Sequence, residues 1–305
     1  MQALYSFFQA ESSDMPAGER EMMRSIDRAY ELYLLSLLFI TELKRAAQMR
    51  VDLGKEKMLP TQEDLNPNLK FVNNRVLAQL EAHPRLHIEA QHRKLGWQRD
   101  EDQELIRKVW DNIRIWEGYK EYMNAEEDNY QRDQEFILEI FKKQIADEEA
   151  FEYFLEERNM HWPGDMNLAV APAIIRTLES SKEDVFPELA PLFRDPEDDK
   201  RFVVDLFRRT IIENDRFSKL IADKTKNWDV DRIALMDVIL MKMALTELVN
   251  FTSIPVKVSL NEYIEISKTY STPKSRQFIN GILDKLVLDM KSDGSIRKTG
   301  RGLLE

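Results

Sequence analysis

The sequence predicts an all-α protein, and three observations support that fold class. Only 9 Gly and 11 Pro occur in 305 residues, so the chain is poor in the residues that form the tight turns of strand-rich proteins. Apolar residues recur at helical spacing over long stretches, whereas the alternation typical of strands is hard to find. Hydrophobic residues make up 43% of the chain, which is enough to bury the core of one large domain or of two ordinary ones.

The predicted helices follow one another along the chain with few breaks. They cover residues 1–10, 19–57, 100–123, 128–158, 197–224 and 230–250, and two more helices follow Pro255 and Thr272-Pro273. Because Thr272 is a favourable N-cap and proline fits the first helical position, the last helix is expected to begin there. The main breaks are residues 10–18, 57–70 and 179–200. The third break gathers three prolines among many acids, so we expect a domain boundary in it.

An internal similarity links two stretches of the chain that lie 66 positions apart. Residues 133–165 align without a gap on residues 199–231. The identical residues are Asp133, Phe136, Phe141, Ile145, Phe151, Trp162 and Asp165, which match residues 199, 202, 207, 211, 217, 228 and 231. Two readings are open: a chance similarity of amphipathic helices, or a structural repeat in which residues 133–165 are a degenerate copy of residues 199–231.

The net charge of −11 is unevenly distributed along the chain. Residues 1–200 hold 26 Lys+Arg against 41 Asp+Glu, a net charge of −15, and residues 201–305 hold 18 against 14, a net charge of +4. A long acidic region is typical of a solvated helical surface, whereas a basic region is suited to a polyanionic partner.

The sequence contains no motif for catalysis, a cofactor or a metal ion. It has no GxGxxG or GxxxxGK[ST] loop for nucleotide phosphates, and no cysteine. The four histidines lack an HExxH pattern, so they are interpreted as surface or capping residues rather than metal ligands. These histidines are His83, His87, His92 and His161. We therefore expect no enzymatic activity, no cofactor, no metal and no small-molecule substrate.

Targeting signals are not evident in the sequence. The longest apolar run, residues 32–40, is too short to cross a bilayer. The first residues lack the charged region and cleavage site of a secretory signal. Since a chain without cysteine also suits a reducing compartment, we expect a cytoplasmic protein without a membrane span.

A basic patch stands out near the C-terminus. The stretch KTYSTPKSRQFINGIL, residues 268–283, contains Lys268, Lys274 and Arg276 but no acid. On a helical wheel, the core face of the last helix is formed by Ile279, Ile282, Leu283, Leu286 and Met290. Phe278 falls at the edge of this face, and its flanking positions are Lys274, Gln277, Gly281 and Lys285. Two readings are open: an aromatic ledge that stacks a base and neutralises its phosphates, or a ring that caps the core beside solvated lysines.

The C-terminal region also resembles the NusB family of transcription antitermination factors. Three motifs carry the resemblance in the correct order: DRIALMDVILMKMALTEL, IPVKVSLNEYIEISK and SRQFINGILDK, all within residues 228–286. The similarity extends more loosely over residues 200–221, and MQALYSFF at the start resembles the middle of the family's first helix. About a third of the chain is covered.

The resemblance implies a compact helical fold that binds boxA RNA together with NusE, the small-subunit ribosomal protein, in transcription elongation complexes that synthesise ribosomal RNA. It implies that the following residues contact RNA: Gln2, Tyr5, Tyr270, Lys274, Gln277 and Phe278. Family members often carry an acid at the position of Lys274 and a basic residue at that of Gln277. We therefore expect Lys274 to strengthen phosphate attraction and Gln277 to weaken it, and we expect Arg276 to meet phosphates as well.

The sequence departs from the family pattern in two respects. Family members precede QALY with an arginine-rich run, whereas this chain begins at Met1; either the true start lies upstream, or that attraction has moved elsewhere in the chain. Two readings of the basic tail at residues 291–305 are open: it supplies the attraction by reaching the same face, or it is a solvated, disordered end. Second, an acidic helical insert is expected at residues 11–195. It separates a first core helix, residues 1–10, from the rest of the NusB-like core, residues 196–290.

The insert has no family role, but its composition suggests two uses. Its aromatic cluster around residues 100–123 is expected to fill a core, with a peptide-binding groove as the alternative. That cluster comprises Trp97, Trp110, Trp116, Tyr119 and Tyr122. Its acidity would suit a basic protein such as NusE. Two functions are therefore open: an RNA-binding antitermination factor, or a helical protein-interaction scaffold that has lost RNA binding.

Overall fold

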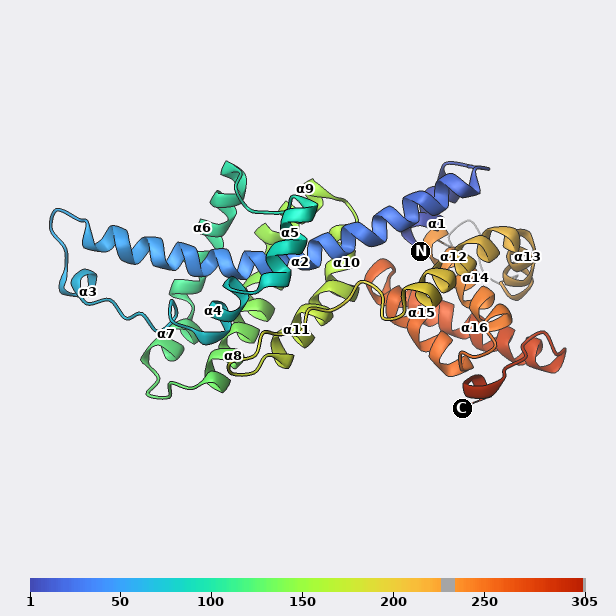
Figure 1. Cartoon of the computed structure of the whole chain (residues 1–305). Helices are drawn as coiled ribbons and strands as arrows, with labels where there is room; N and C mark the ends of the chain where they lie inside the picture. The colour runs from blue at the N-terminus through green and yellow to red at the C-terminus, as the bar shows by residue number, and fades with distance from the viewer. Residues whose placement is uncertain (226–233, 304–305) are drawn as a thin grey trace. The chain divides into compact units, whose positions relative to one another are not determined.

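The computed structural model describes residues 1–225 and 234–303, and it confirms the all-α class (Figure 1). The described residues form helices and no strand, and a single isolated bridge joins Lys182 to Val185. The chain divides into two compact units. The terminal unit comprises Met1–Ile26 and Phe193–Glu305, and the middle unit comprises Asp27–Leu192. The middle unit falls inside the predicted insert, while residues 11–26 group with the terminal unit.

The terminal unit is built around helix α14. Its elements are α1 (Gln2–Gln9), the start of α2 (Met15–Lys55), α12 (Pro196–Ile212), α13 (Asn214–Lys224), α14 (Leu235–Asn250), α15 (Val256–Tyr270), α16 (Pro273–Ser292) and η4 (Gly300–Leu303). Helix α14 contacts α1, α12, α13, α15 and α16. Nearly every residue from Ile239 to Leu248 is buried, as expected of a helix that is apolar on all sides and occupies the centre of a bundle.

The middle unit has a comparable central segment. The apolar run at residues 32–40, within α2, is buried along its whole length. The other elements of this unit are α3 (Gln62–Leu65), α4 (Arg75–Glu81), α5 (Pro84–Arg93), α6 (Asp100–Ile115), α7 (Glu117–Asn124), α8 (Tyr130–Ile140), η1 (Phe141–Ala146), α9 (Glu149–Arg158), α10 (Trp162–Asp165), η2 (Met166–Val170) and α11 (Ala171–Ser180). None of the helices described has the length and apolar character needed to span a bilayer.

The aromatic cluster of the middle unit fills a core. Trp97, Trp110 and Tyr122 are buried, and Trp116 and Tyr119 are partly buried against the same core. The ring of Tyr122 stacks on that of Phe136 with their centroids 3.8 Å apart. The rings therefore pack against one another, as the sequence predicted.

The sequence missed helices within residues 75–93 and 162–180, where each helix is short. Three predicted helices are interrupted: 100–123 at Trp116, whose backbone is extended, 128–158 at residues 147–148, and 197–224 at Glu213. His83 is the buried N-cap of α5: its Nδ1 accepts from the Leu86 amide at 3.2 Å. This confirms a capping role for one of the four histidines.

The proposed repeat has matching helix boundaries. With the same shift of 66 positions, residues 130–146 of α8 and η1 fall on α12, residues 196–212, and α9 falls on α13. Phe207 and Phe217 are buried, as are their counterparts Phe141 and Phe151. Trp228 and Asp231, which complete the alignment, lie outside the described residues. The repeat stays a prediction.

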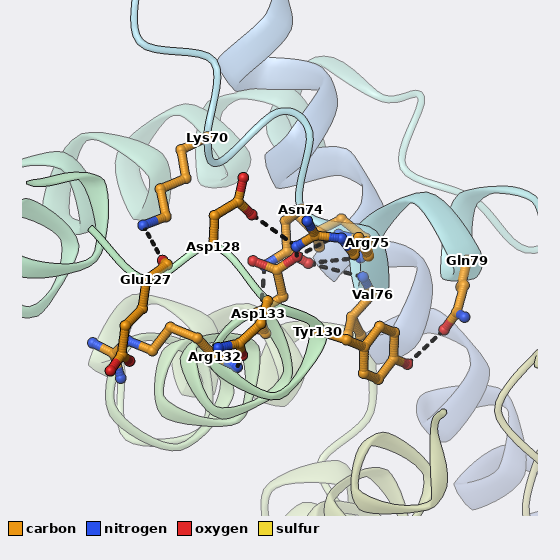
Figure 2. Close-up of polar contacts among 12 residues, drawn as sticks. Lys70, Asn74, Arg75, Val76, Gln79, Glu127, Asp128, Tyr130, Arg132 and Asp133 are labelled. Atoms are coloured by element: carbon orange, nitrogen blue, oxygen red, sulfur yellow. Dashed lines mark hydrogen bonds and ion pairs between the residues drawn. The ribbon is translucent and has the colours of Figure 1, made fainter. Parts of the chain in front are cut away.

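A buried polar network holds α4 to α8 in the middle unit (Figure 2). The carboxylate of Asp133 accepts a hydrogen bond from the Tyr122 hydroxyl at 2.6 Å. It also accepts from the backbone N–H and the guanidinium of Arg75, at 3.0 and 2.9 Å. Asn74 caps α4 by accepting from two amides and donates to the Tyr122 hydroxyl at 3.2 Å. Burial raises the pKa of Tyr122 well above its usual value, so this hydroxyl remains a donor.

Replacing Asp133 by alanine is expected to destabilise the middle unit by about 2–3 kcal/mol, because it leaves a buried hydroxyl without its acceptor. Asp128→Ala is the matched control: Asp128 pairs with the same Arg75, but its side chain is 69% exposed, and surface pairs contribute little. Urea unfolding followed by circular dichroism measures both. Equal losses in the two variants would show that the network has no special role.

Candidate nucleic-acid interface

Helix α1 presents one face to the core and one to the surface. Leu4 and Phe7 are buried and belong to the core of the terminal unit. Gln2 and Tyr5 lie three residues apart and therefore share a face; Gln2 is partly buried and Tyr5 is 36% exposed. The two α1 residues predicted to contact RNA thus lie side by side on the helix.

The corner between α15 and α16 is fixed by hydrogen bonds. The Thr272 hydroxyl accepts from the Ser275 amide at 3.1 Å, and Pro273 occupies the first turn of α16, which confirms the predicted helix start. The neighbouring Ser271 hydroxyl donates to the buried carboxylate of Asp237 in α14. Since a buried carboxylate needs such partners, the corner is anchored to the central helix.

A hydrogen bond joins the two ends of the chain at this corner. The side-chain amide of Gln2 donates to the hydroxyl of Tyr270, the last residue of α15, at 2.8 Å. The two residues are 268 positions apart in the sequence. The structure therefore brings the predicted α1 residues to the predicted α15–α16 residues.

The first turns of α16 supply cations and a half-covered ring. Lys274 and Gln277 are exposed, Arg276 is partly buried, and Phe278 is partly buried against the core of the terminal unit. Within the described parts of the chain, neither Lys274 nor Arg276 has an acidic partner at salt-bridge distance. Phe278 therefore contributes to the core and also reaches the surface.

The surface beside Phe278 is open at Gly281. A β-carbon built on Gly281 would meet no atom within 4 Å.

The predicted core face of α16 is confirmed, since all five of its members are at most 3% exposed. They are Ile279, Ile282, Leu283, Leu286 and Met290. We call the seven predicted RNA contacts at this corner, Gln2, Tyr5, Tyr270, Lys274, Arg276, Gln277 and Phe278, the corner surface.

Two buried charges that support this surface were missed by the sequence analysis. Lys242 donates to the Asn214 side-chain oxygen at 2.6 Å and lies 5.5 Å from the centroid of the Phe8 ring in α1. Burial lowers the pKa of Lys242. Glu247 accepts from the hydroxyls of Ser259 and Tyr263 in α15, at 2.7 and 2.8 Å. The only sequence signal for either residue was a charge within an otherwise apolar helix.

The basic tail does not extend the corner surface. The Lys298 ammonium donates to the Phe251 carbonyl at 3.0 Å, and the Thr299 amide donates to the Thr252 carbonyl at 2.9 Å. These contacts lie just before α15 begins, whereas Tyr270 ends that helix. A helix of 15 residues is about 22 Å long. The expectation that the tail supplies the phosphate attraction of an arginine-rich run at the corner is therefore not supported.

The two units differ in net charge. The middle unit holds 33 acidic and 22 basic residues, a net charge of −11, and the terminal unit holds 22 of each. No group of three or more His, Asp or Glu side chains that could hold a metal ion occurs among the residues described. The corner surface combines aromatic rings, amides and cations, which are the groups that bind single-stranded nucleic acid.

Comparison with known proteins identifies relatives of the terminal unit. The family model described as "NusB family" matches residues 176–288. The transcription antitermination protein NusB of Salinibacter ruber is 44% identical over 114 residues, which are 37% of this chain and 71% of that protein. The NusB protein of Chloroherpeton thalassium is 41% identical over 106 residues, 35% of this chain and 50% of that protein. The NusB protein of Symbiobacterium thermophilum is 34% identical over 127 residues, which are 42% of this chain and 78% of that protein. No solved structure matches the chain.

Replacing Gly302 by alanine is expected to release the tail, because a β-carbon there would lie 2.0 Å from the Thr252 carbonyl oxygen. The Thr299 amide should then exchange its hydrogen faster. Gly281→Ala is the matched control: its site is open, so it should leave the tail protected and stabilise α16 by about 0.5–1 kcal/mol. Unchanged exchange at Thr299 in the Gly302 variant would contradict the tail's docking.

Proposed function

This chain belongs to the NusB family, and we propose that it acts in transcription antitermination as an RNA-binding factor without catalytic activity. The proposal extends to this chain the role named for its relatives, the transcription antitermination proteins NusB. Most of the family match, residues 176–288, falls in the terminal unit, and it is the unit that we propose binds RNA.

The observation that carries the proposal is the hydrogen bond between Gln2 and Tyr270. It joins α1 to the end of α15 and so makes one surface from residues at opposite ends of the chain. On this surface, we propose that bases stack on Tyr5, Tyr270 and the accessible part of Phe278. Splayed single-stranded RNA is the nucleic acid that such rings recognise, because the bases of a duplex are already stacked.

Phosphates would be met by Lys274 and Arg276, which have no acidic partner at salt-bridge distance in the described chain. Phosphate contacts position a nucleic acid, whereas contacts to the bases provide sequence specificity. Gln277, with an amide in place of a charge, would contribute hydrogen bonds but no counterion release.

The resemblance to the family supports a more specific partner set. We propose that the RNA is of the boxA type, that NusE binds together with it, and that the complex acts with the transcription elongation complex during ribosomal RNA synthesis. The net charge of −11 on the middle unit would attract a basic ribosomal protein and repel misplaced RNA.

A helical scaffold that binds proteins without RNA is the second candidate. The partial burial of Phe278 and the acidity of the middle unit favour it. Titration of boxA RNA with and without NusE at two salt concentrations separates the two. NusE capture without any RNA binding would support the scaffold.

Replacing Phe278 by leucine is expected to weaken boxA RNA binding by ~1–3 kcal/mol, because leucine keeps the apolar contact with the core but removes the stacking face. Phe278→Ala should weaken binding as much and destabilise the fold in addition. Fluorescence anisotropy measures affinity, and circular dichroism checks folding. Wild-type affinity in a folded Phe278→Leu protein would rule out stacking at this ring.

Replacing Lys274 by glutamine is expected to flatten the salt dependence of RNA binding. Each lost phosphate contact lowers the slope of log K against log salt by about 0.7 for single strands. Lys219→Gln is the matched control, since Lys219 is an exposed lysine on α13, outside the corner surface. An identical slope change in both variants would show that Lys274 acts only through net charge.

A further inference from the structure

The C-terminal tail packs against the terminal unit after α16. After α16 ends, the amide of Ile296 donates to the Met290 carbonyl at 2.9 Å, and the Ile296 side chain is 8% exposed. The hydroxyls of Thr299 and Thr252 are 3.1 Å apart, and Gly302 is buried against the Thr252 carbonyl. Residues 298–302 of the tail are therefore held against the connection between α14 and α15.

Cations from α12, α15 and the tail lie around this connection. The Lys298 ammonium donates to the Phe251 carbonyl, and the guanidinium of Arg209 in α12 donates to the Asn250 side chain at 2.8 Å. Lys257 lies in the first turn of α15, and Arg301 lies in η4, next to Gly302. Arg209, Lys257 and Arg301 are exposed. We call these four residues the tail patch.

No ion pair joins any of the four members of the tail patch to an acid in the described chain. The nearby Glu247 is buried and bonded to Ser259 and Tyr263, and its charge acts on the partly buried Lys298. Glu213 pairs with Arg216 and accepts from the Asn250 amide, the side chain that Arg209 also bonds. The three exposed members, Arg209, Lys257 and Arg301, therefore form no ion pair within the described chain, although the terminal unit as a whole has no net charge.

The aromatic rings beside the tail patch are packed against each other. Phe251 and Phe202 meet edge to face with their centroids 4.9 Å apart, and both are partly buried. A surface whose exposed residues are cations contacts the phosphates of a nucleic acid rather than its bases. Its binding would not depend on base sequence.

We propose that the tail patch is a second RNA contact, which holds the phosphate backbone of the strand beyond the corner surface. This inference rests on the proposed RNA-binding function. The length of α15 separates the two surfaces by about 22 Å, which a stacked strand covers with roughly six nucleotides at 3.4 Å each and a splayed strand with fewer. The corner surface reads the bases of a short site, and the tail patch adds affinity only for RNA long enough to reach it.

The test compares two RNAs and two double variants. The short RNA contains only the boxA site, and the long RNA extends it by about ten nucleotides on each side. Lys257→Gln/Arg301→Gln removes two exposed cations of the patch and leaves the Lys298 anchor in place. Arg201→Gln/Lys219→Gln, also exposed and in the terminal unit, removes the same charge elsewhere. Fluorescence anisotropy over a range of salt concentrations gives affinity and salt slope.

The wild-type protein should bind the long RNA more tightly than the short one. The patch variant should bind the short RNA like the wild type, but the long RNA more weakly, with a salt slope lower by about 1.4 for two lost phosphate contacts. The control variant should leave both slopes unchanged.

Three results would contradict the proposed role of the tail patch without contradicting RNA binding at the corner surface. They are equal affinity of the wild-type protein for both RNAs, an unchanged salt slope for the long RNA in the patch variant, and an equal change of that slope in the control variant. A wild-type protein that binds neither RNA would overturn both proposals. Circular dichroism establishes that each variant is folded.

Discussion

The terminal unit depends on the requirement that every ionisable group buried in α14 be hydrogen-bonded. Three such groups lie inside this mostly apolar helix, and each bonds a different segment. Asp237 bonds Ser271 at the α15–α16 corner, Lys242 bonds Asn214 at the start of α13 and lies beside Phe8 of α1, and Glu247 bonds two hydroxyls of α15. Because a buried polar or charged group without a hydrogen-bond partner is costly, these bonds favour the observed arrangement of the surrounding helices. That arrangement places Gln2 within hydrogen-bonding distance of Tyr270.

The charge distribution follows the same division as the fold. The net charge of −11 resides in the middle unit, and the terminal unit carries equal numbers of acids and bases. Within the terminal unit the basic residues are concentrated locally: residues 268–283 contain no acid, and no member of the tail patch forms an ion pair in the part of the chain that the structure describes. An acidic protein can therefore present cationic surfaces, since the local field is set by charges within about 8–10 Å at physiological salt.

Much of the terminal unit could be predicted from the sequence, because its signals are local. The apolar stripe of α16 and the Thr272-Pro273 start depend on neighbouring residues only, and both were predicted. Phe278 could not be assigned, since a residue at the edge of a stripe is placed by what packs beside it. The Asp133 network was also unpredictable, because its members are up to 59 positions apart. The tail patch depends on backbone contacts of Thr299 and Gly302, which leave no pattern in the sequence.

Photo-crosslinking tests the central claim most directly. A boxA RNA that carries 4-thiouridine is irradiated with the full-length protein, and the crosslinked peptides are identified by mass spectrometry. The account predicts crosslinks to Tyr5 in α1 and to residues 270–278 at the α15–α16 corner, both lost when unlabelled RNA competes. Crosslinks confined to the middle unit, or none in the presence of NusE, would contradict it.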